Sequence, residues 1–362
     1  MSELFVGLMT GTSLDGIDAV IVDLAAEAPK LIASLGAPLS PELRQQLFQL
    51  QAPSEDELHL AQIAANSHSR ACAEVVLALL KQAGLQTTDI VAIGNHGQTI
   101  RHRPELRYTL QIGNHAMLAE YTGITVVGDF RSRDVAAGGQ GAPLVPAFHQ
   151  ALFAKPNSNR VVVNIGGIAN LSHLAANGDV IGFDSGPGNV LLDAWMLQHN
   201  ARHYDANGDW AATGTVLPDL LTQMQAEPFF TLPAPKSTGR DLFHLAWLSQ
   251  HLTGRTDAPA DVQATLCELT AWSIATAIKQ QGTPDEVYVC GGGVHNAHLM
   301  HRLAAYLPRQ VQSTQALGVD PDWVEAFAFA WLAQRCILGL TANLPAVTGA
   351  RGKRVLGAIW PA

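Results

Sequence analysis

Thr10-Gly-Thr-Ser-Leu-Asp-Gly16 joins two apolar runs of β type, Phe5–Met9 and Ile17–Leu24. The pattern recurs later in the chain, where the run Arg160–Ile165 leads into Gly166-Gly-Ile-Ala-Asn-Leu-Ser172 and a short return strand. Hairpins of this kind expose backbone N–H groups, and two of them can bind a polyphosphate from both sides. The repeated hairpin therefore predicts two like halves and favours phosphoryl-transfer chemistry.

Each hairpin is followed by apolar residues at helical spacing and then by one more strand-like run. In the first half, the helical spacing covers 41–83, with a helix start predicted at Ser40-Pro41-Glu42 and a helix stop at Gly84. The run Ile90–Ile93 then ends in Gly94-Asn-His-Gly-Gln-Thr99. The second half is predicted to contain three helices and one further strand, at 187–199, 240–253, 260–281 and 286–290. Strands that alternate with long helices predict parallel crossover units and an α/β fold.

The length of 362 residues suits two domains. We expect an N-terminal half, 1–130, and a C-terminal half, 131–362, with the glycine-rich stretch 126–146 as a hinge-proximal loop that also lines a cleft. The apolar run 324–340 approaches the length of a membrane helix but contains Glu325, so a buried helix is the better interpretation. This helix is a candidate to cross back to the first half.

Composition narrows the class of partner. The formal net charge of −9 argues against nucleic acid or an anionic membrane surface. The four cysteines lie far apart and form no C-x-x-C pair, which is typical of reduced thiols in the cytoplasm. Glu3 stands where a signal peptide needs basic residues, so secretion is not expected. These features favour a cytoplasmic protein that acts on small molecules.

The turn Thr10–Gly16 has two interpretations. In one, its N–H groups form an anion-binding concavity to which Thr12-Ser13 adds hydroxyl donors, and Asp15 and Asp18 hold Mg²⁺ beside the phosphates. In the other, it is a tight hairpin whose glycines satisfy turn geometry. The second copy, with Gly166-Gly167, favours anion binding. Neither turn has the Gly-Lys-Ser/Thr of a Walker loop or the G-x-G-x-x-G of a dinucleotide site.

A third glycine cluster, Gly291-Gly-Gly293, follows a predicted strand and precedes a helix that starts at Asn296. Without side chains, these residues would let the flat face of a nucleoside lie against the backbone. A glycine-rich strand-to-helix turn that only packs closely explains the same residues. Local sequence leaves both interpretations open.

Six motifs, in this order along the chain, resemble those of anhydro-N-acetylmuramic acid kinases, within the sugar kinase/actin/heat-shock ATPase superfamily. They are Gly11-Thr-Ser-Leu-Asp-Gly16, Asn95-His-Gly-Gln-Thr99, Gly128-Asp-Phe-Arg131, Asn164-Ile-Gly-Gly-Ile-Ala-Asn170, Gly182-Phe-Asp-Ser-Gly-Pro-Gly-Asn189 and Gly291-Gly-Gly-Val-His-Asn296. The sequence departs from the wider superfamily at Met9 and Asn164, where many relatives carry acidic residues. Magnesium ligands are therefore not carried over from the general pattern.

The resemblance implies a two-domain actin-like ATPase (ribonuclease H-like) fold with a central interdomain cleft, and a homodimer. It implies that ATP, water and 1,6-anhydro-N-acetylmuramic acid give N-acetylmuramic acid 6-phosphate and ADP, with Mg²⁺, in cytoplasmic peptidoglycan recycling. The implied ATP contacts are Gly11, Thr12, Ser13, Leu14, Asp15, Gly16, Ile17, Asp18, Gly166, Gly167, Gly291, Gly292 and Gly293.

Asp184 is the candidate catalytic residue. It stands between Phe183 and Ser185-Gly-Pro-Gly188, at a strand end that enters a helix. Our hypothesis is that it acts as a general base on a water molecule that attacks the anomeric carbon, while the released O6 attacks the γ-phosphoryl group. The competing interpretation is an N-cap of the helix near Val190–Leu197.

By resemblance, the sugar contacts are Asn95, Gln98, Thr99, Arg131 and Glu325. A forked guanidinium suits the lactyl carboxylate of the sugar, although a structural ion pair with Asp129 or Asp134 would also explain Arg131. Glu325 would equally suit the first turn of its helix.

Two other functions compete with the kinase. An ATP-gated clamp would use the same two halves but leaves Asp184 unexplained. A hydrolase that acts without ATP leaves both glycine hairpins unexplained.

Overall fold

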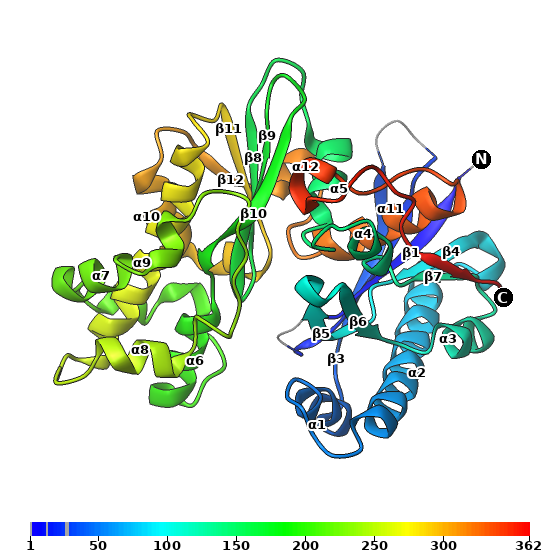
Figure 1. Cartoon of the computed structure of the whole chain (residues 1–362), viewed down its shortest axis with the longest axis horizontal. Coiled ribbons are helices and arrows are strands. Elements are labelled where there is room, and N and C mark those ends of the chain that lie inside the picture. The colour runs from blue at the N-terminus through cyan, green and yellow to red at the C-terminus, as the bar shows by residue number, and fades with distance from the viewer. Residues whose placement is uncertain (1, 12–13, 26–28) are drawn as a thin grey trace. The chain divides into compact units, whose positions relative to one another are not determined.

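The computed structural model describes residues 2–11, 14–25 and 29–362, and it divides into two compact units (Figure 1). Unit 1 consists of Met1–Leu152 and Trp323–Ala362, and unit 2 of Phe153–Asp322. These boundaries differ from the predicted division at residue 130. The C-terminal helix α11 (Val324–Ile337) packs on the first hairpin, and α4 (Ser132–Ala136) packs on the strand β6 (Tyr108–Ile112).

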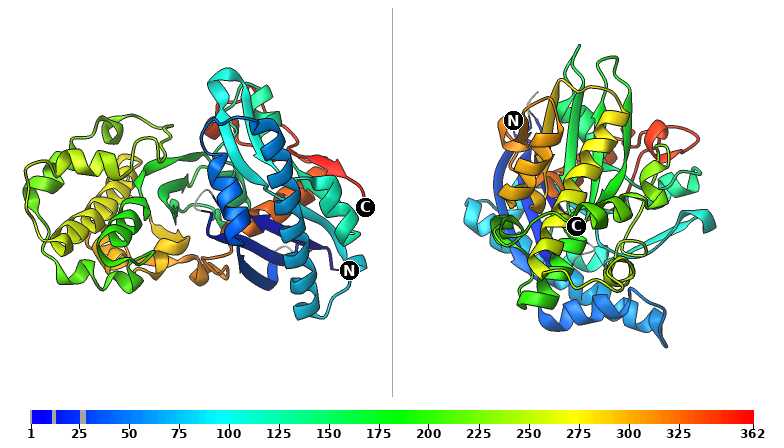
Figure 2. Two further views of the ribbon diagram at one scale, coloured as in Figure 1. Left: turned by 90° about the horizontal axis from the view of Figure 1, so that it is seen from below. Right: turned by 90° about the vertical axis from the view of Figure 1, so that its left-hand side faces the viewer.

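A six-stranded mixed sheet forms the centre of unit 1, in the order β13-β7-β4-β1-β2-β3. Its strands are β1 (Leu4–Met9), β2 (Gly16–Asp23), β3 (Lys30–Pro38), β4 (Ile90–Asn95), β7 (Val126–Gly128) and β13 (Ala358–Trp360). The predicted hairpin is present: β1 runs antiparallel to β2, and β1 runs parallel to β4. Strand β13 lies at the outer edge of this sheet (Figure 2, left).

Two helices cover opposite faces of this sheet. Val6 and Leu8 of β1 belong to one core cluster with the buried residues of α2 (Glu57–Ala83). Because side chains alternate along a strand, Gly7 faces the other side, where α11 (Val324–Ile337) packs. A Cβ at Gly7 would overlap the carbonyl group of Ala326. The strand glycine thus permits the close approach that places α11 in unit 1.

The predicted helix ends in the first half are confirmed. Ser40 caps α1 (Pro41–Gln49), accepting a hydrogen bond from the Leu43 N–H at 3.2 Å, and Gly84 ends α2 with φ +69°. The remaining elements of unit 1 are β5 (Gln98–Arg103), β6 (Tyr108–Ile112), α3 (His115–Thr122), α4 (Ser132–Ala136), α5 (Val145–Phe153), α12 (Pro345–Thr348), η1 (Thr87–Asp89) and η2 (Pro104–Leu106). No helix among the described residues is long and apolar enough to cross a bilayer.

Unit 2 repeats the strand order of unit 1. Its sheet runs β10-β9-β8-β11-β12, with β8 antiparallel to β9 and parallel to β11. The strands are β8 (Arg160–Ile165), β9 (Ile168–Leu174), β10 (Val180–Pro187), β11 (Glu286–Cys290) and β12 (Val311–Ser313). The corresponding order in unit 1 is β3-β2-β1-β4-β7. The repeated topology confirms the predicted α/β fold with two like halves.

The helices of unit 2 gather on one side of its strands (Figure 2, left). They are α6 (Val190–Asn200), α7 (Pro218–Gln225), α8 (Leu245–His251), α9 (Pro259–Gln280) and α10 (Ala297–Tyr306), with η3 (Ala206–Gly208), η4 (Ala211–Thr213), η5 (Pro228–Thr231), η6 (Gly292–His295) and η7 (Thr314–Leu317). Helix α8 begins later than the predicted residue 240, because the His244 side chain caps it by accepting from the Trp247 N–H at 3.1 Å. Buried α9 forms the centre of this core.

Candidate active site

Asp184 lies on β10 and is fixed by a segment more than fifty residues later. Its Oδ2 accepts hydrogen bonds from Ser237 Oγ at 2.8 Å and from the Thr238 N–H at 2.9 Å. Its own N–H donates to the Lys236 carbonyl at 3.0 Å. The β9–β10 ladder shifts register directly after Asp184, a bulge of the kind that re-aims side chains beside functional sites. The strand and the 236–238 segment therefore set the direction of this carboxylate together.

The electrostatics of Asp184 suit a base. Burial raises its pKa above the usual 3.8, while the bonds from Thr238 and Ser237 oppose that shift. Oδ1 has no hydrogen-bond partner among the described residues, so one carboxylate oxygen is available to a water molecule. The N-cap interpretation is wrong, because Asn189 occupies the cap of α6 and Asp184 lies inside the sheet.

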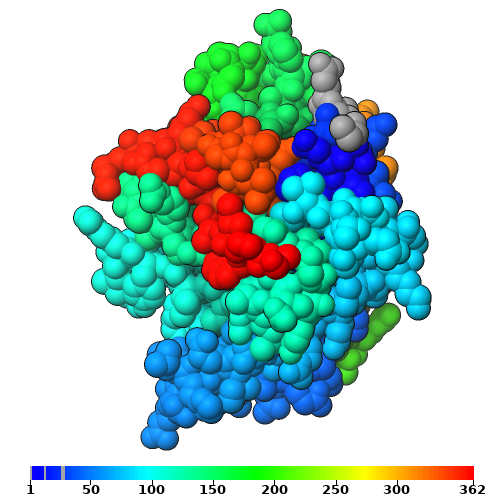
Figure 3. All heavy atoms as spheres, turned by 90° about the vertical axis from the view of Figure 1, so that its right-hand side faces the viewer, coloured from blue at the N-terminus to red at the C-terminus, as the bar shows by residue number. Residues whose placement is uncertain are grey.

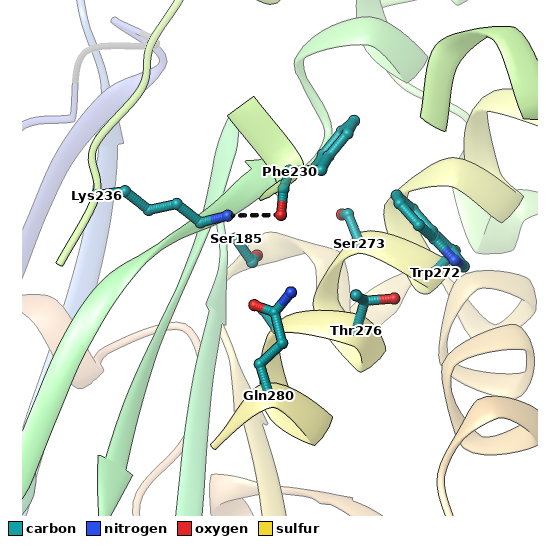
Figure 4. Close-up of a pocket in the computed structure, with 8 residues that line it drawn as sticks. Ser185, Phe230, Lys236, Trp272, Ser273, Thr276 and Gln280 are labelled. Carbon is teal, nitrogen blue, oxygen red and sulfur yellow. Dashed lines mark hydrogen bonds between the residues drawn. The ribbon is translucent and has the colours of Figure 1, made fainter. Parts of the chain in front are cut away.

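A small hollow beside β10 shows what holds the 236–238 segment (Figure 4). Lys236 Nζ donates to the carbonyl groups of Phe229 at 3.0 Å and Phe230 at 3.2 Å. Ser185 Oγ donates to the Ala169 carbonyl at 3.1 Å, which ties β10 to β9. Sequence reasoning missed this segment. In the sequence, the polar stretch of residues 236–239 was the one feature that could have marked this segment as part of a site.

The second glycine turn joins β8 to β9 and lies against the start of α6. The Gly167 carbonyl accepts from the Gly188 N–H at 2.9 Å and from the Val190 N–H at 3.0 Å, and the Gly166 carbonyl accepts from the Asn189 N–H at 2.9 Å. Both turn glycines are partly exposed. The carbonyl groups of the turn are therefore bonded to the start of α6, while the two glycines remain partly exposed to solvent.

The third glycine cluster packs beside the second turn. Gly291 has φ +78°, and a Cβ at Gly293 would overlap the side chain of Ile165 at the end of β8. Gly292, in contrast, has open space around its Cα. The close packing accounts for Gly291 and Gly293, and Gly292 is the position that is free to meet a ligand.

A surface hollow lies next to this cluster, lined by Val294, His295, Ser313, Gln315, Asp320 and Asp322. His295 Nε2 lies 2.7 Å from Asp322 Oδ1. The hollow has hydrogen-bonding groups on several sides, as a flat polar ligand requires. None of these lining residues was predicted from the sequence as a site residue.

In unit 1, the first turn is described in part, and Thr12 and Ser13 lie outside the described residues. Leu14 donates its N–H to the Gly11 carbonyl at 3.2 Å, and the side chains of Leu14 and Ile17 are buried in the core. Those two residues can therefore meet a ligand only through their backbone. Asp15 is exposed, and Asp18 is partly buried on β2.

The predicted sugar contacts Asn95, Gln98 and Thr99 surround the end of β4. Asn95 Oδ1 accepts from the Gly97 N–H at 3.0 Å, and Thr99 Oγ1 accepts from Gln111 Nε2 at 3.1 Å. The buried Gln98 side chain leaves its Oε1 without a hydrogen-bond partner among the described residues. A carbonyl oxygen without a partner can accept a hydrogen bond from a hydroxyl or amide group of a sugar.

Arg131 is held by groups other than the carboxylates considered from sequence. Its Nη1 donates to the Gly141 carbonyl at 2.8 Å, and its Nε and Nη2 lie 3.3 and 3.0 Å from His96 Nε2. Asp134 bonds instead to the Gly141 N–H at 2.8 Å and to two residues of the C-terminal segment. Burial lowers the Arg131 pKa to about 10, and Glu325 on α11 opposes the shift. No ion pair within hydrogen-bonding range joins Arg131 to Asp129 or Asp134 in the described parts of the chain.

The C-terminal residues lie on the surface of unit 1 (Figure 3). Asn343 Nδ2 and Thr348 Oγ1 donate to Asp134 Oδ1 at 2.7 and 2.8 Å. Since Asp134 Oδ2 fixes the Gly141 N–H, this segment indirectly supports the carbonyl group that binds Arg131. The stretch 126–146 is thus fixed by Asn343 and Thr348, which lie about two hundred residues later and could not be linked to it from the sequence.

Comparison with known proteins decides the family. A family model described as anhydro-N-acetylmuramic acid kinase matches residues 3–362. The chain belongs to the anhydro-N-acetylmuramic acid kinase family. Proteins named anhydro-N-acetylmuramic acid kinase from Nitrosospira multiformis and Bordetella petrii are 54% and 55% identical to it. The alignments cover 99% of this chain in both cases, and 99% and 97% of the relatives.

Among solved structures, component A of (R)-2-hydroxyglutaryl-CoA dehydratase from Acidaminococcus fermentans is 12% identical, with a TM-score of 0.49. That alignment covers 91% of this chain and 96% of the other.

Proposed function

We propose that this protein is an ATP-dependent kinase that opens 1,6-anhydro-N-acetylmuramic acid with water and phosphorylates O6. The products are N-acetylmuramic acid 6-phosphate and ADP. Membership of the family supports the overall reaction. The observation that carries it in this chain is Asp184, a half-buried carboxylate with one oxygen anchored by two hydrogen bonds and the other available. An anhydro sugar has no free O6 hydroxyl, so the reaction needs a base that acts on water.

In the proposed reaction, Asp184 Oδ1 takes a proton from the water as the water oxygen bonds to the anomeric carbon. The bond between that carbon and O6 breaks, and its electron pair stays on O6. O6 then bonds to the γ-phosphorus, and the bond from that phosphorus to the oxygen it shares with ADP breaks. The phosphoryl group takes the place of the acid that glycosidases use to protonate the leaving oxygen. Base catalysis of this kind contributes about 10²–10⁴-fold.

The glycine turns are the proposed ATP contacts. Backbone N–H groups at Gly11 and at Gly166-Gly167 bind the phosphates, and the open position Gly292 meets the nucleoside. The neighbouring hollow with His295 and Asp322 supplies hydrogen-bonding groups for the base or the ribose. The hydroxyl groups of the first turn complete the phosphate contacts.

Mg²⁺ is proposed as the metal ion of the reaction. No cluster of three acidic, His or Cys side chains is present in the described ranges. Mg²⁺ does not require one, because it is commonly held by one or two carboxylates together with phosphate oxygens. Asp15 is exposed on the first turn with no hydrogen-bond partner among the residues that the structure describes, and Asp18 follows it on β2, so these carboxylates would hold the ion. When bound, Mg²⁺ neutralises charge on the phosphates.

Arg131 is the proposed partner of the lactyl carboxylate. Its guanidinium is oriented by hydrogen bonds to neutral acceptors, and Glu325 on α11 is the carboxylate whose charge acts on it. Gln98 Oε1 and the neighbouring Asn95, Thr99 and Glu325 are the proposed contacts to the rest of the sugar. Arg131 belongs to unit 1 and Asp184 to unit 2, so the proposed reaction uses residues of both units.

We further propose a homodimer in the cytoplasm, with a role in peptidoglycan recycling. Cys72, Cys267 and Cys336 are buried free thiols, which suits a reducing compartment. The dimer is suggested by the family resemblance alone, and light scattering coupled to size exclusion would measure it directly.

A coupled ADP-release assay tests the function. The kinase releases ADP only when ATP and the anhydro sugar are both present, in a one-to-one ratio with phosphorylated sugar. An ATP-gated clamp would show no sugar-dependent ADP release. A hydrolase would open the sugar without ATP. Either of the last two results would refute the proposed function.

A further inference from the structure

The guanidinium of Arg131 is oriented by a histidine that has no role in the proposed chemistry. Nε and Nη2 of Arg131 lie 3.3 and 3.0 Å from Nε2 of His96. Arg131 is always a donor, so Nε2 must be the acceptor of both bonds. The ring is therefore neutral, with its proton on Nδ1, which is buried and has no hydrogen-bond partner among the described residues.

The surroundings of His96 favour this neutral ring. Its side chain is buried and stacks on Phe329 of α11, with ring centroids 4.8 Å apart. Burial and the charge of Arg131 lower the His96 pKa well below 6.5, while backbone groups of Thr10 and Gly97 oppose the shift. His68 on α2 also faces it and lowers the pKa slightly.

The backbone of His96 is fixed as firmly as its ring. Its N–H donates to the Leu8 carbonyl at 3.1 Å, which joins the end of β4 to β1 just before the first glycine turn. On the other side of the guanidinium, Gly141 is anchored by Asp134. The Arg131 guanidinium thus contacts two groups, the His96 ring and the Gly141 carbonyl, whose own backbones are fixed by hydrogen bonds.

A neutral acceptor and a carboxylate would affect the charge of Arg131 differently. It fixes the direction of the guanidinium without neutralising its charge, so an anionic ligand does not have to displace a bonded partner. A carboxylate at the place of His96 would compete with the ligand. The arrangement preorganises the Arg131 guanidinium for binding a carboxylate.

We propose that His96 is a positioning residue that holds Arg131 ready for the carboxylate of the sugar. This inference rests on the proposed role of Arg131 in sugar binding. It predicts that sugar affinity depends on a hydrogen-bond acceptor at the position of Nε2, and that another side chain with an acceptor there can replace the histidine.

The test compares three replacements by calorimetric titration with the anhydro sugar, in the presence of a non-hydrolysable ATP analogue. His96→Leu removes the acceptor and should weaken sugar binding about tenfold or more, since hydrogen bonds to charged groups are the stronger ones. His96→Gln places an amide oxygen near the position of Nε2 and should stay within about threefold of wild type. His96→Asn is too short to do so and should resemble His96→Leu. Binding of the ATP analogue should change less than about twofold in all three.

Two controls separate positioning from folding. His173→Leu replaces a partly buried histidine on β9 of unit 2 and should leave sugar binding unchanged. Thermal melts identify any variant that fails to fold, and the comparison of His96→Gln with His96→Asn then still decides the question, because both are neutral and polar.

A double-mutant cycle completes the test. If His96 acts through Arg131, adding His96→Leu to Arg131→Ala should weaken sugar binding less than about twofold further. Independent, multiplicative effects would overturn the inference, as would equal sugar affinity in His96→Leu and wild type. If Arg131→Ala itself leaves sugar binding unchanged, the assignment of Arg131 fails instead. If wild type binds no sugar, the proposed function fails.

Discussion

Replacing Asp184 by Asn tests the proposed base with little change in structure. The Asn side-chain oxygen can accept from Ser237 Oγ and the Thr238 N–H as Oδ2 does, at 2.8 and 2.9 Å in the wild type. The amide nitrogen then takes the place of Oδ1 and cannot accept a proton. The variant should fold, bind ATP and bind the sugar, yet lose turnover.

The size of the loss follows from the role assigned to Asp184. A positioned general base contributes about 10²–10⁴-fold, or about 3–5 kcal/mol of barrier. The folding stability of Asp184→Asn, in contrast, should not fall. Burial holds the Asp184 pKa above its usual value, so at neutral pH the ionised side chain disfavours the folded state. Asn does not ionise, and its melting temperature at neutral pH should equal or exceed that of wild type.

Steady-state ADP release with saturating sugar measures the effect, and Asp209→Asn is the matched control. Asp209 is an exposed carboxylate in the same unit, and its replacement should leave kcat within about twofold. The wild-type kcat should fall as pH drops through the raised pKa of Asp184, because the protonated carboxyl is no base. An Asp184→Asn enzyme that keeps more than about a tenth of the wild-type rate would refute the assignment.

Three further predictions follow from the contacts described. Ser237→Ala removes one of the two bonds that lower the Asp184 pKa, so the acidic limb of the kcat profile should move to higher pH, by up to about one unit; an unmoved limb would separate that limb from Asp184. Arg131→Ala should raise KM for the sugar more than KM for ATP, and equal effects would contradict its assignment. In Gly94→Ala, the added Cβ would overlap the Phe329 carbonyl of α11, so the free energy of unfolding should fall by about 1–3 kcal/mol, as a chemical denaturation curve would show.

Local pattern was enough to predict the elements that repeat. The hairpin glycines and the apolar runs beside them marked β1–β2 and β8–β9, and Ser40 and Gly84 marked helix ends. We predicted a boundary at residue 130, whereas the structure divides the chain after residues 152 and 322. It places α11, which the sequence offered as a candidate to cross back to the first half, in unit 1. Gly7 sits within a strand whose apolar residues continue on both sides, and this interruption was the available signal of a close approach.

The site was predictable only in part, for a similar reason. Asp184 was found through its neighbours in sequence, but Ser237 lies 53 residues away and reaches it only in the folded chain. The neutral acceptor of Arg131 was missed as well. His96 stood inside a quoted motif, yet nothing in its spacing from Arg131 distinguishes an acceptor from the carboxylates that flank the arginine.

The central claim is that water attacks the sugar while the phosphoryl group goes to O6. Carrying out the reaction in H₂¹⁸O, with mass spectrometry of the product before its anomeric oxygen exchanges, tests this directly, and unlabelled product kept in the same water measures the exchange. The account predicts one ¹⁸O on the anomeric carbon and none in the phosphoryl group. Label in the phosphoryl oxygens, or a sugar that carries no label, would contradict it.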